Sequence, residues 1–153
     1  LGEDLGIFIA QLLDEPLTGV EVQYNGEVAD QRIDPITISV LKGLLTRNIE
    51  GINMVNAPFI ARDRGIEVKE SRSTEVHEYT STIKVTAKTN KGERSVTGSV
   101  FGKGDSRIVQ IDEFYWRHKG CFLCIRKSGK CTINFVDKHP LTHLSKREAL
   151  KHF

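Results

Sequence analysis

The sequence predicts an α+β domain in which helices back a mixed or antiparallel sheet. Three observations predict it: two apolar runs with helical periodicity, several stretches in which apolar and polar residues alternate, and turn residues between them. The chain has 153 residues, of which 39% are apolar and 27% charged. That length suffices for one ordinary hydrophobic core. We therefore expect one folded domain followed by a tail.

The first two elements are predicted between the N-terminus and Gly26. Apolar residues recur at helical spacing over residues 5–13, and Pro16 ends this run. Val20, Val22 and Tyr24 then alternate with polar residues, which is typical of a strand with one buried face. Asn25-Gly26 provides the turn residues that close this strand.

Two further helices are predicted from their end signals. Asp34-Pro35 is typical of an N-cap and first turn, and it precedes a helix over residues 35–45 whose apolar face packs on the sheet. Asn56 and Pro58 start a shorter helix in the same way, and Gly65 supplies the left-handed conformation that stops it.

The second half of the domain is predicted to consist of strands. The strand candidates cover residues 66–71, 79–88, 94–101 and 107–111. The segment 89–92, Thr-Asn-Lys-Gly, has the turn residues that a hairpin requires between the second and third of them.

The charge distribution divides the chain near residue 113. Residues 1–112 hold 13 Lys and Arg against 17 Asp and Glu, a net charge of −4, whereas residues 113–153 hold 9 against 3, a net charge of +6. All three cysteines and four of the five histidines also lie in the second part. Such a change in composition predicts a boundary there.

The composition argues against a membrane or secreted protein. No apolar run approaches the roughly 18 residues of a membrane helix, and no signal-peptide pattern opens the chain. Three cysteines, an odd number, do not make a disulfide framework. We therefore expect a cytoplasmic protein.

Three segments carry a resemblance to a known family. They are VNAPFIARDRGIEVKES at 55–71, SVTGSVFG at 95–102 and RIVQID at 107–112. They resemble the intervening, or allosteric substrate-binding, domain of the long form of D-3-phosphoglycerate dehydrogenase. The opening residues, LGEDLGIFIAQL, look like the helix that leaves that enzyme's catalytic region. A related domain occurs in the iron–sulfur L-serine dehydratases.

The resemblance implies a fold and a division of the chain. The fold is the one shared with the serine dehydratase beta chain, called the allosteric substrate-binding domain fold. Residues 1–15 correspond to a linker helix from the catalytic region, residues 16–112 to the intervening domain and residues 113–153 to a basic tail. The catalytic and NAD-binding parts of the family lie upstream of this region, so we expect a fragment without catalytic or cofactor-binding residues of its own.

A regulatory role follows from the same resemblance. In the family this domain binds an anionic effector or substrate-like molecule at a site lined by basic residues, and Arg107 matches one such position. We add Lys103 because it lies close by, in a glycine-containing segment whose backbone amides can converge on an anion. The implied partners are this anion, the other domains of the dehydrogenase and further copies of the subunit.

The segment GKGDSR at 102–107 does not predict a dinucleotide site. Its sixth position is Arg107 rather than glycine or alanine, and strands rather than a helix are predicted on both sides. A dinucleotide fingerprint needs a strand, a glycine-rich turn and a helix whose N-terminus receives the pyrophosphate.

The tail departs from the family, in which an ACT domain follows. Residues 120–125 are compatible with its first strand, but the Pro-Gly turn and the helix start that follow in the family are missing. A shifted reading frame or a degenerated gene would produce such a tail. An alternative hypothesis is a free-standing binding module, because Cys121, Cys124, His139 and His143 have zinc-ligand spacing.

Nucleic acid is a second alternative partner for the basic tail. Lys and Arg clusters neutralise phosphates. However, aromatic residues are largely absent between the basic ones, and the first 112 residues are net acidic. Nucleic-acid binding is therefore the weaker hypothesis.

Overall fold

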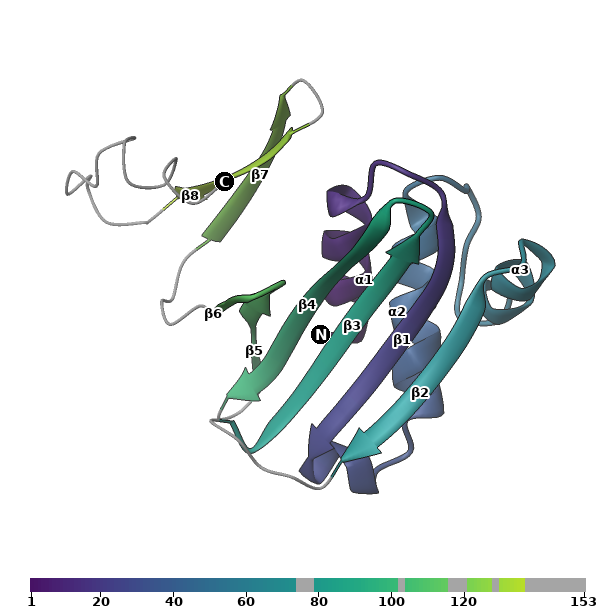
Figure 1. Ribbon diagram of the computed structural model, residues 1–153. Coiled ribbons are helices and arrows are strands. Elements are labelled where there is room, and N and C mark those ends of the chain that lie inside the picture. Colours follow the sequence, from purple (N-terminus) through teal and green to yellow (C-terminus); the bar gives the residue numbers. More distant parts are fainter. Residues whose placement is uncertain (74–78, 102–103, 116–120, 128–129, 137–153) are drawn as a thin grey trace. The chain divides into compact units, whose positions relative to one another are not determined.

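The computed structural model describes residues 1–73, 79–101, 104–115, 121–127 and 130–136. The chain forms two compact units, Leu1–Arg117 and His118–Phe153. The first contains the helices and the main sheet, and the second contains a hairpin of two strands (Figure 1).

The sheet of the first unit contains six strands among the described residues, in the order β2-β1-β3-β4-β5-β6. β1 and β2 pair in parallel, and all other neighbours pair antiparallel. The sheet is therefore mixed, as predicted. The strands are β1 (Leu17–Gly26), β2 (Glu67–Ser73), β3 (Ser81–Thr89), β4 (Gly92–Phe101), β5 (Asp105–Ile111) and the short β6 (Phe114–Tyr115).

Two helices cover one face of this sheet. α1 (Gly2–Leu12) and α2 (Asp34–Thr46) lie side by side behind it (Figure 1). They approach closely at Gly6 and Gly43, where an added Cβ would collide with backbone atoms of the opposite helix. Neither these helices nor α3 (Ala57–Asp63) is long and apolar enough to cross a membrane.

The core lies between the two helices and the sheet. The alternating residues Val20, Val22 and Tyr24 of β1 are all buried, as are Val85 of β3 and Val96 of β4. They pack against the buried helix residues Leu5, Ile9, Val40, Leu41 and Leu44. The period-two pattern of β1 therefore marks the face that the helices cover, and the α+β fold predicted from the sequence is confirmed.

The start of α2 differs from the prediction by one residue, whereas α3 begins where it was predicted to begin. α2 begins at Asp34, so that Ile33 is the N-cap, and neither residue makes a side-chain cap hydrogen bond. Asn56 is the N-cap of α3 and Pro58 lies in its first turn, as predicted. The Asn56 side chain, however, bonds within the preceding loop, accepting from the Asn53 amide at 2.8 Å and donating to the Gly51 carbonyl at 3.0 Å.

The other end of α3 follows the prediction. Gly65 has a φ of +69°, and its amide donates to the Arg62 carbonyl at 3.0 Å. The Ile66 amide reaches back to Ala61 at 2.9 Å, so the last carbonyls of the helix are satisfied. The single 3-10 turn (Glu27–Asp30) after β1, which buries Val28 and Ala29, was not predicted, nor were the strands β6 and β8 (Lys130–Val136).

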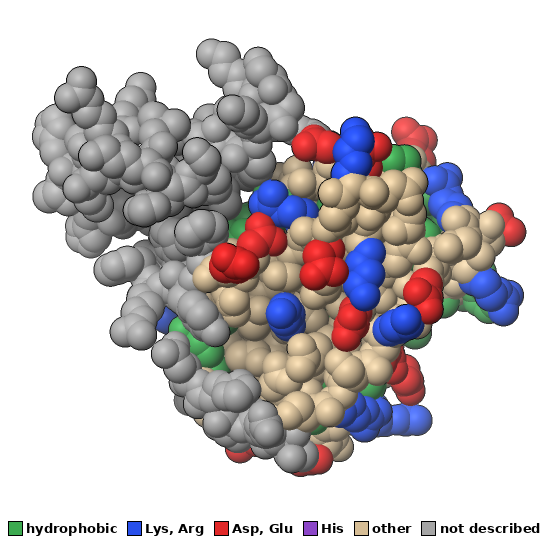
Figure 2. All heavy atoms as spheres, in the orientation of Figure 1, with side chains coloured by type: hydrophobic (Ala, Val, Ile, Leu, Met, Phe, Trp, Pro, Cys, Tyr) green, Lys and Arg blue, Asp and Glu red, His purple; other side chains and the backbone are tan. Residues whose placement is uncertain are grey.

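The face of the sheet opposite the helices is polar. It carries Glu21 and Lys88, which form an ion pair at 3.3 Å, together with threonines and serines from β3 and β4. Figure 2 shows acidic and basic side chains interspersed over this face. The alternation of burial along β1 and β3 places their polar residues on this side.

The second unit contains the strands β7 (Cys121–Lys127) and β8 (Lys130–Val136), which pair antiparallel. β7 includes most of the segment in which the sequence suggested a strand. The division into units falls after Arg117, close to the change in charge near residue 113.

Candidate functional site

Arg107 lies on the polar face of the sheet, near one end of β4 and β5. It pairs in register with Ser99, whose neighbour across the next ladder is Thr82. Its guanidinium carbon lies 4.7 Å from the centroid of the Phe101 ring. The ring of Tyr79 meets the Phe101 ring edge-on, with the two ring centroids 5.6 Å apart. The guanidinium of Arg107 thus makes a cation–π contact with Phe101.

Asp105 occupies one side of the Arg107 guanidinium. Its Oδ2 accepts from Nε at 2.9 Å and also from Nη2. A guanidinium has five N–H groups, so Nη1 and the second Nη2 hydrogen remain for another acceptor. Within the described residues no acceptor for Nη1 is found. This arrangement orients the arginine and leaves one edge of its fork for a carboxylate or phosphate.

The second predicted member of the anion site, Lys103, lies outside the described residues. The structure places neither its backbone nor its ammonium, so its role stays a prediction. The site that can be described consists of the guanidinium of Arg107, the carboxylate of Asp105 and the rings of Phe101 and Tyr79.

The glycine-containing segment 102–107 connects two antiparallel strands. β4 ends at Phe101, which pairs with Asp105 of β5, so the chain reverses direction within this segment. Gly104 has a φ of +100°, which favours glycine. No helix follows β4 here, and a helix N-terminus is what a dinucleotide site needs for the pyrophosphate. These residues do not fit NAD.

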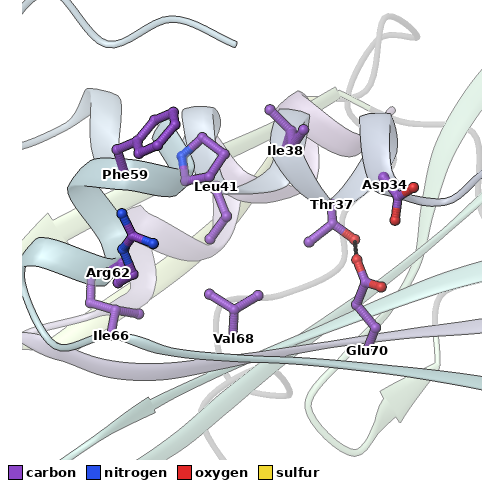
Figure 3. A pocket seen from close by; sticks show the side chains of 10 residues that line it. Asp34, Thr37, Ile38, Leu41, Phe59, Arg62, Ile66, Val68 and Glu70 are labelled. Atoms are coloured by element: carbon purple, nitrogen blue, oxygen red, sulfur yellow. Dashed lines mark hydrogen bonds between the residues drawn. The ribbon is translucent and has the colours of Figure 1, made fainter. Parts of the chain in front are cut away.

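A second feature, which the sequence analysis missed, is a cavity of about 500 Å³ between the helix layer and the edge of the sheet. Figure 3 shows it bounded by α2 and α3 on one side and by β2 on the other. Its lining is largely apolar, with charged groups at its ends. The lining residues are Asp34, Thr37, Ile38, Leu41, Pro58, Phe59, Arg62, Ile66, Val68 and Glu70.

A chain of hydrogen bonds links this cavity to the core. The Thr37 hydroxyl donates to Oε1 of Glu70, and the Tyr24 and Thr37 hydroxyls lie 2.6 Å apart. Because Thr37 gives its only hydrogen to the carboxylate, Tyr24 is the donor in the other bond. Burial raises the pKa of Tyr24 to about 12, and the charge of Glu70 adds to this rise. The tyrosine therefore keeps its proton at neutral pH.

A signal for this cavity was present in the sequence. The short helix carries apolar side chains on two faces: Ala57 and Ala61 are buried, whereas Phe59 is 60% exposed. The buried alanines are sufficient to pack a helix of seven residues, so Phe59 is an additional exposed apolar residue. Val68 of β2, which lines the same cavity as Phe59, is 38% exposed.

The proposed zinc ligands are only partly described. Cys121 and Cys124 both lie in β7, while His139 and His143 lie outside the described residues. Within the part of the chain that the structure describes, no group of three or more His, Cys, Asp and Glu side chains could hold a metal ion. The four-residue zinc hypothesis stays a prediction.

Comparison with known proteins agrees with the fold. A family model described as the D-3-phosphoglycerate dehydrogenase intervening domain matches residues 1–112. The D-3-phosphoglycerate dehydrogenase of Methanocaldococcus jannaschii is 44% identical over 115 residues, covering 74% of this chain and 22% of that protein. The Synechocystis enzyme is 34% identical over 116 residues, covering 74% and 21%.

A third relative matches more of the chain. The D-3-phosphoglycerate dehydrogenase of Mycobacterium tuberculosis (strain H37Rv) is 32% identical over 138 residues, which is 88% of this chain and 25% of that protein. This match extends beyond residue 112. The chain spans about a fifth to a quarter of the length of these relatives. Through residues 1–112, this chain belongs to the D-3-phosphoglycerate dehydrogenase intervening domain family.

Proposed function

We propose that the first unit is a noncatalytic regulatory and assembly domain of an NAD-dependent D-3-phosphoglycerate dehydrogenase, acting in cytoplasmic L-serine biosynthesis. The family match over residues 1–112 carries this proposal. The catalytic and NAD-binding parts would belong to other domains, because the glycine-containing segment at residue 104 joins antiparallel strands and does not fit a dinucleotide. Those domains and further copies of the subunit are the expected partners.

The regulatory ligand is proposed to be a small anion that binds Arg107, with Lys103 as a second basic group. The support for this is geometric. Phe101 and Asp105 hold the guanidinium in one orientation, and one edge of its fork stays available to a carboxylate or phosphate. Such a ligand shifts the population of enzyme conformations only if it binds one arrangement of the domains more tightly than another.

Calorimetric titration of the 153-residue chain with inorganic phosphate and with 3-phosphoglycerate tests the anion site. Arg107→Ala should abolish the binding heat, and Asp105→Asn should increase affinity because it removes the negative charge that pairs with the guanidinium and repels an anion. Lys103→Ala should weaken binding by less than Arg107→Ala. Arg32→Ala is the control, since Arg32 is exposed and distant in sequence from this strand pair.

Two results would contradict this site. Equal affinity in Arg107→Ala and the parent chain would show that the anion binds elsewhere. A loss of affinity in Asp105→Asn comparable with that in Arg107→Ala would show that Asp105 supports the site rather than competing with the ligand. Thermal unfolding of each variant shows whether a loss of binding reflects a loss of structure.

A further inference from the structure

The strand β2 is an edge of the sheet formed by the described residues. It pairs with β1 on one side, and among the described residues no strand pairs with it on the other. Alternate residues of such a strand direct their N–H and C=O groups away from the sheet. These groups form a row that another extended chain can pair with.

The cavity between the helices and the sheet lies directly along this edge. Ile66, Val68 and Glu70 are alternate residues and line it from below, as Figure 3 shows for the sheet side. Ile38 and Leu41 of α2 line it from above. An additional strand beside β2 would continue the pleat of the sheet, so every second side chain of that strand would point into the same layer as these residues.

Along β2 the lining changes from the apolar Ile66 and Val68 to the acidic Glu70, and Arg62 of α3 lies beside the Phe59 ring, 5.6 Å from its centroid. Phe59 and Val68 are the exposed apolar groups, and no described side chain covers them fully. Toward the other end lie the carboxylates of Asp34 and Glu70, and Thr37 holds one oxygen of the latter. A basic side chain would complement this acidic end, and an apolar one would complement the ring and the valine.

We propose that the β2 edge and the adjoining cavity bind an extended segment of a partner polypeptide by strand addition. In this segment an apolar residue and a basic residue two positions apart enter the cavity, the first against Phe59 and Val68, the second against Glu70 and Asp34. Main-chain hydrogen bonds to β2 provide affinity, and the alternate side chains provide specificity. This site is separate from the Arg107 site on the polar face and does not depend on it.

The probe is a synthetic peptide, acetyl-Thr-Val-Thr-Val-Thr-Lys-Thr-amide, together with the same sequence in reverse order to cover both strand directions. Titration into the full 153-residue chain is followed by calorimetry and by NMR shifts of the β2 amides. At least one of the two should bind saturably. Replacing its lysine by glutamate should weaken binding by about tenfold, the effect expected from about 1.4 kcal/mol of charge interaction.

Three variants locate the site. Phe59→Ala and Glu70→Gln should each weaken the lysine peptide severalfold, and Glu70→Lys should prefer the glutamate peptide, which reverses the charge selection. Matched controls are Met54→Ala, an exposed apolar residue outside the cavity, and Glu93→Gln, an exposed carboxylate on β4. Neither control should alter the affinity.

Backbone pairing is tested with a peptide in which alternate amides are N-methylated. One of the two possible methylation patterns should abolish binding, because it removes the hydrogen bonds to β2. Equal binding of both patterns, or competition by hexylamine with the same dependence on Glu70, would overturn strand addition in favour of a small amphipathic amine site.

Two other results would also overturn the proposal. The absence of saturable binding up to about 1 mM of either peptide would exclude an affinity useful in recognition. A concentration-dependent dimer that Glu70→Lys dissociates, seen by sedimentation, would show that a second copy of the chain occupies the edge.

Discussion

The two sides of α2 differ in how completely they are packed. Toward α1, Gly43 lets the two helices approach until an added Cβ would meet the backbone of Glu3. Lys42 pairs with Glu3 at 2.8 Å across this interface, and Arg47 donates to the carbonyls of Ala10 and Leu13 at the end of α1. Toward α3 and β2, the same helix borders a cavity of about 500 Å³.

The difference follows from where the sheet ends. α1 lies over the interior strands β3 and β4, and α2 lies beside it, with Thr37 bonded to Tyr24 of the interior strand β1. On its other side, α2 extends over β2, and no described strand lies beyond that edge. α3 is too short to fill the space. The side of α2 toward α1, called here the closed side, therefore supplies stability. The side toward α3 and β2, called the open side, leaves surface available for binding.

The largest expected effect is at the closed side. Gly43→Ala should destabilise the first unit by about 3 kcal/mol, because the new methyl group collides with helix backbone that has no room to move. This loss would exceed the roughly 1 kcal/mol that alanine gains over glycine in an open helix. Chemical denaturation followed by circular dichroism measures the change.

Gly19→Ala is the matched control for this substitution. A Cβ added at Gly19 would meet its nearest neighbour, the Glu67 carbonyl, at an ordinary 3.4 Å. The unfolding free energy of this variant should change by no more than about 1 kcal/mol. Equal losses in the two variants would show that the helix contact is not tighter than the strand contact.

The next effect concerns Tyr24, which lies at the boundary between the two sides. The pKa of Tyr24 is raised to about 12 in the folded chain, against 10.0 for a free tyrosine. Between pH 10 and pH 12 the unfolded chain binds fewer protons at Tyr24 than the folded chain does. The stability that this tyrosine contributes is therefore fully present below pH 10 and is lost as the pH rises to 12. The loss approaches about 3 kcal/mol at the upper limit.

The Tyr24→Phe variant separates this titration from that of other groups. Its stability should fall less steeply between pH 10 and 12 than that of the parent chain. A parallel slope in both proteins would show that other residues cause the alkaline loss. Urea midpoints measured at intervals over this pH range provide the comparison.

At neutral pH, Tyr24→Phe should cost about 1 kcal/mol. The variant loses the 2.6 Å hydrogen bond to Thr37 but keeps the ring in the core. Thr37 retains its bond to Glu70, which limits the loss. An unchanged unfolding free energy would mean that the hydroxyl makes no net contribution to stability.

The smallest effect is expected at the open side. Phe59→Ala should change the unfolding free energy by less than about 0.5 kcal/mol, since the ring is 60% exposed and contacts mainly Arg62. Leu44→Ala, on the buried face of α2, should cost about 2 kcal/mol by contrast. Similar losses in the two variants would remove the distinction between a closed and an open side.

The strands were largely predictable because their signals are local. The alternation of Val20, Val22 and Tyr24 identified both the strand and its buried face, and the segment 89–92 identified the hairpin between β3 and β4. Gly65 likewise ended its helix where predicted. Asn56 is the N-cap of α3 as predicted, but its side chain bonds to Asn53 and Gly51 in the preceding loop, and the N-cap of α2 is Ile33 rather than Asp34.

The candidate sites divide in the same way. Arg107 was identified through the family resemblance, but its contacts with Phe101 and Asp105 depend on the register of β4 and β5. The cavity was missed because its lining comes from three elements separated in sequence. The parallel pairing of β1 with β2 could not be read from periodicity, since strands in parallel and antiparallel pairs alternate alike.

Local sequence patterns were enough to predict most helices and strands of the first unit and the buried face of β1, because periodicity and turn residues act over a few neighbouring positions. The family resemblance was also visible in the sequence, in residues 55–71, 95–102 and 107–112. Only the tertiary structure decided that β2 forms the edge, that glycines close one side of α2 and that the other side borders a cavity. These properties depend on contacts between segments that are far apart in the sequence, and local sequence patterns carry no information on which distant segments meet.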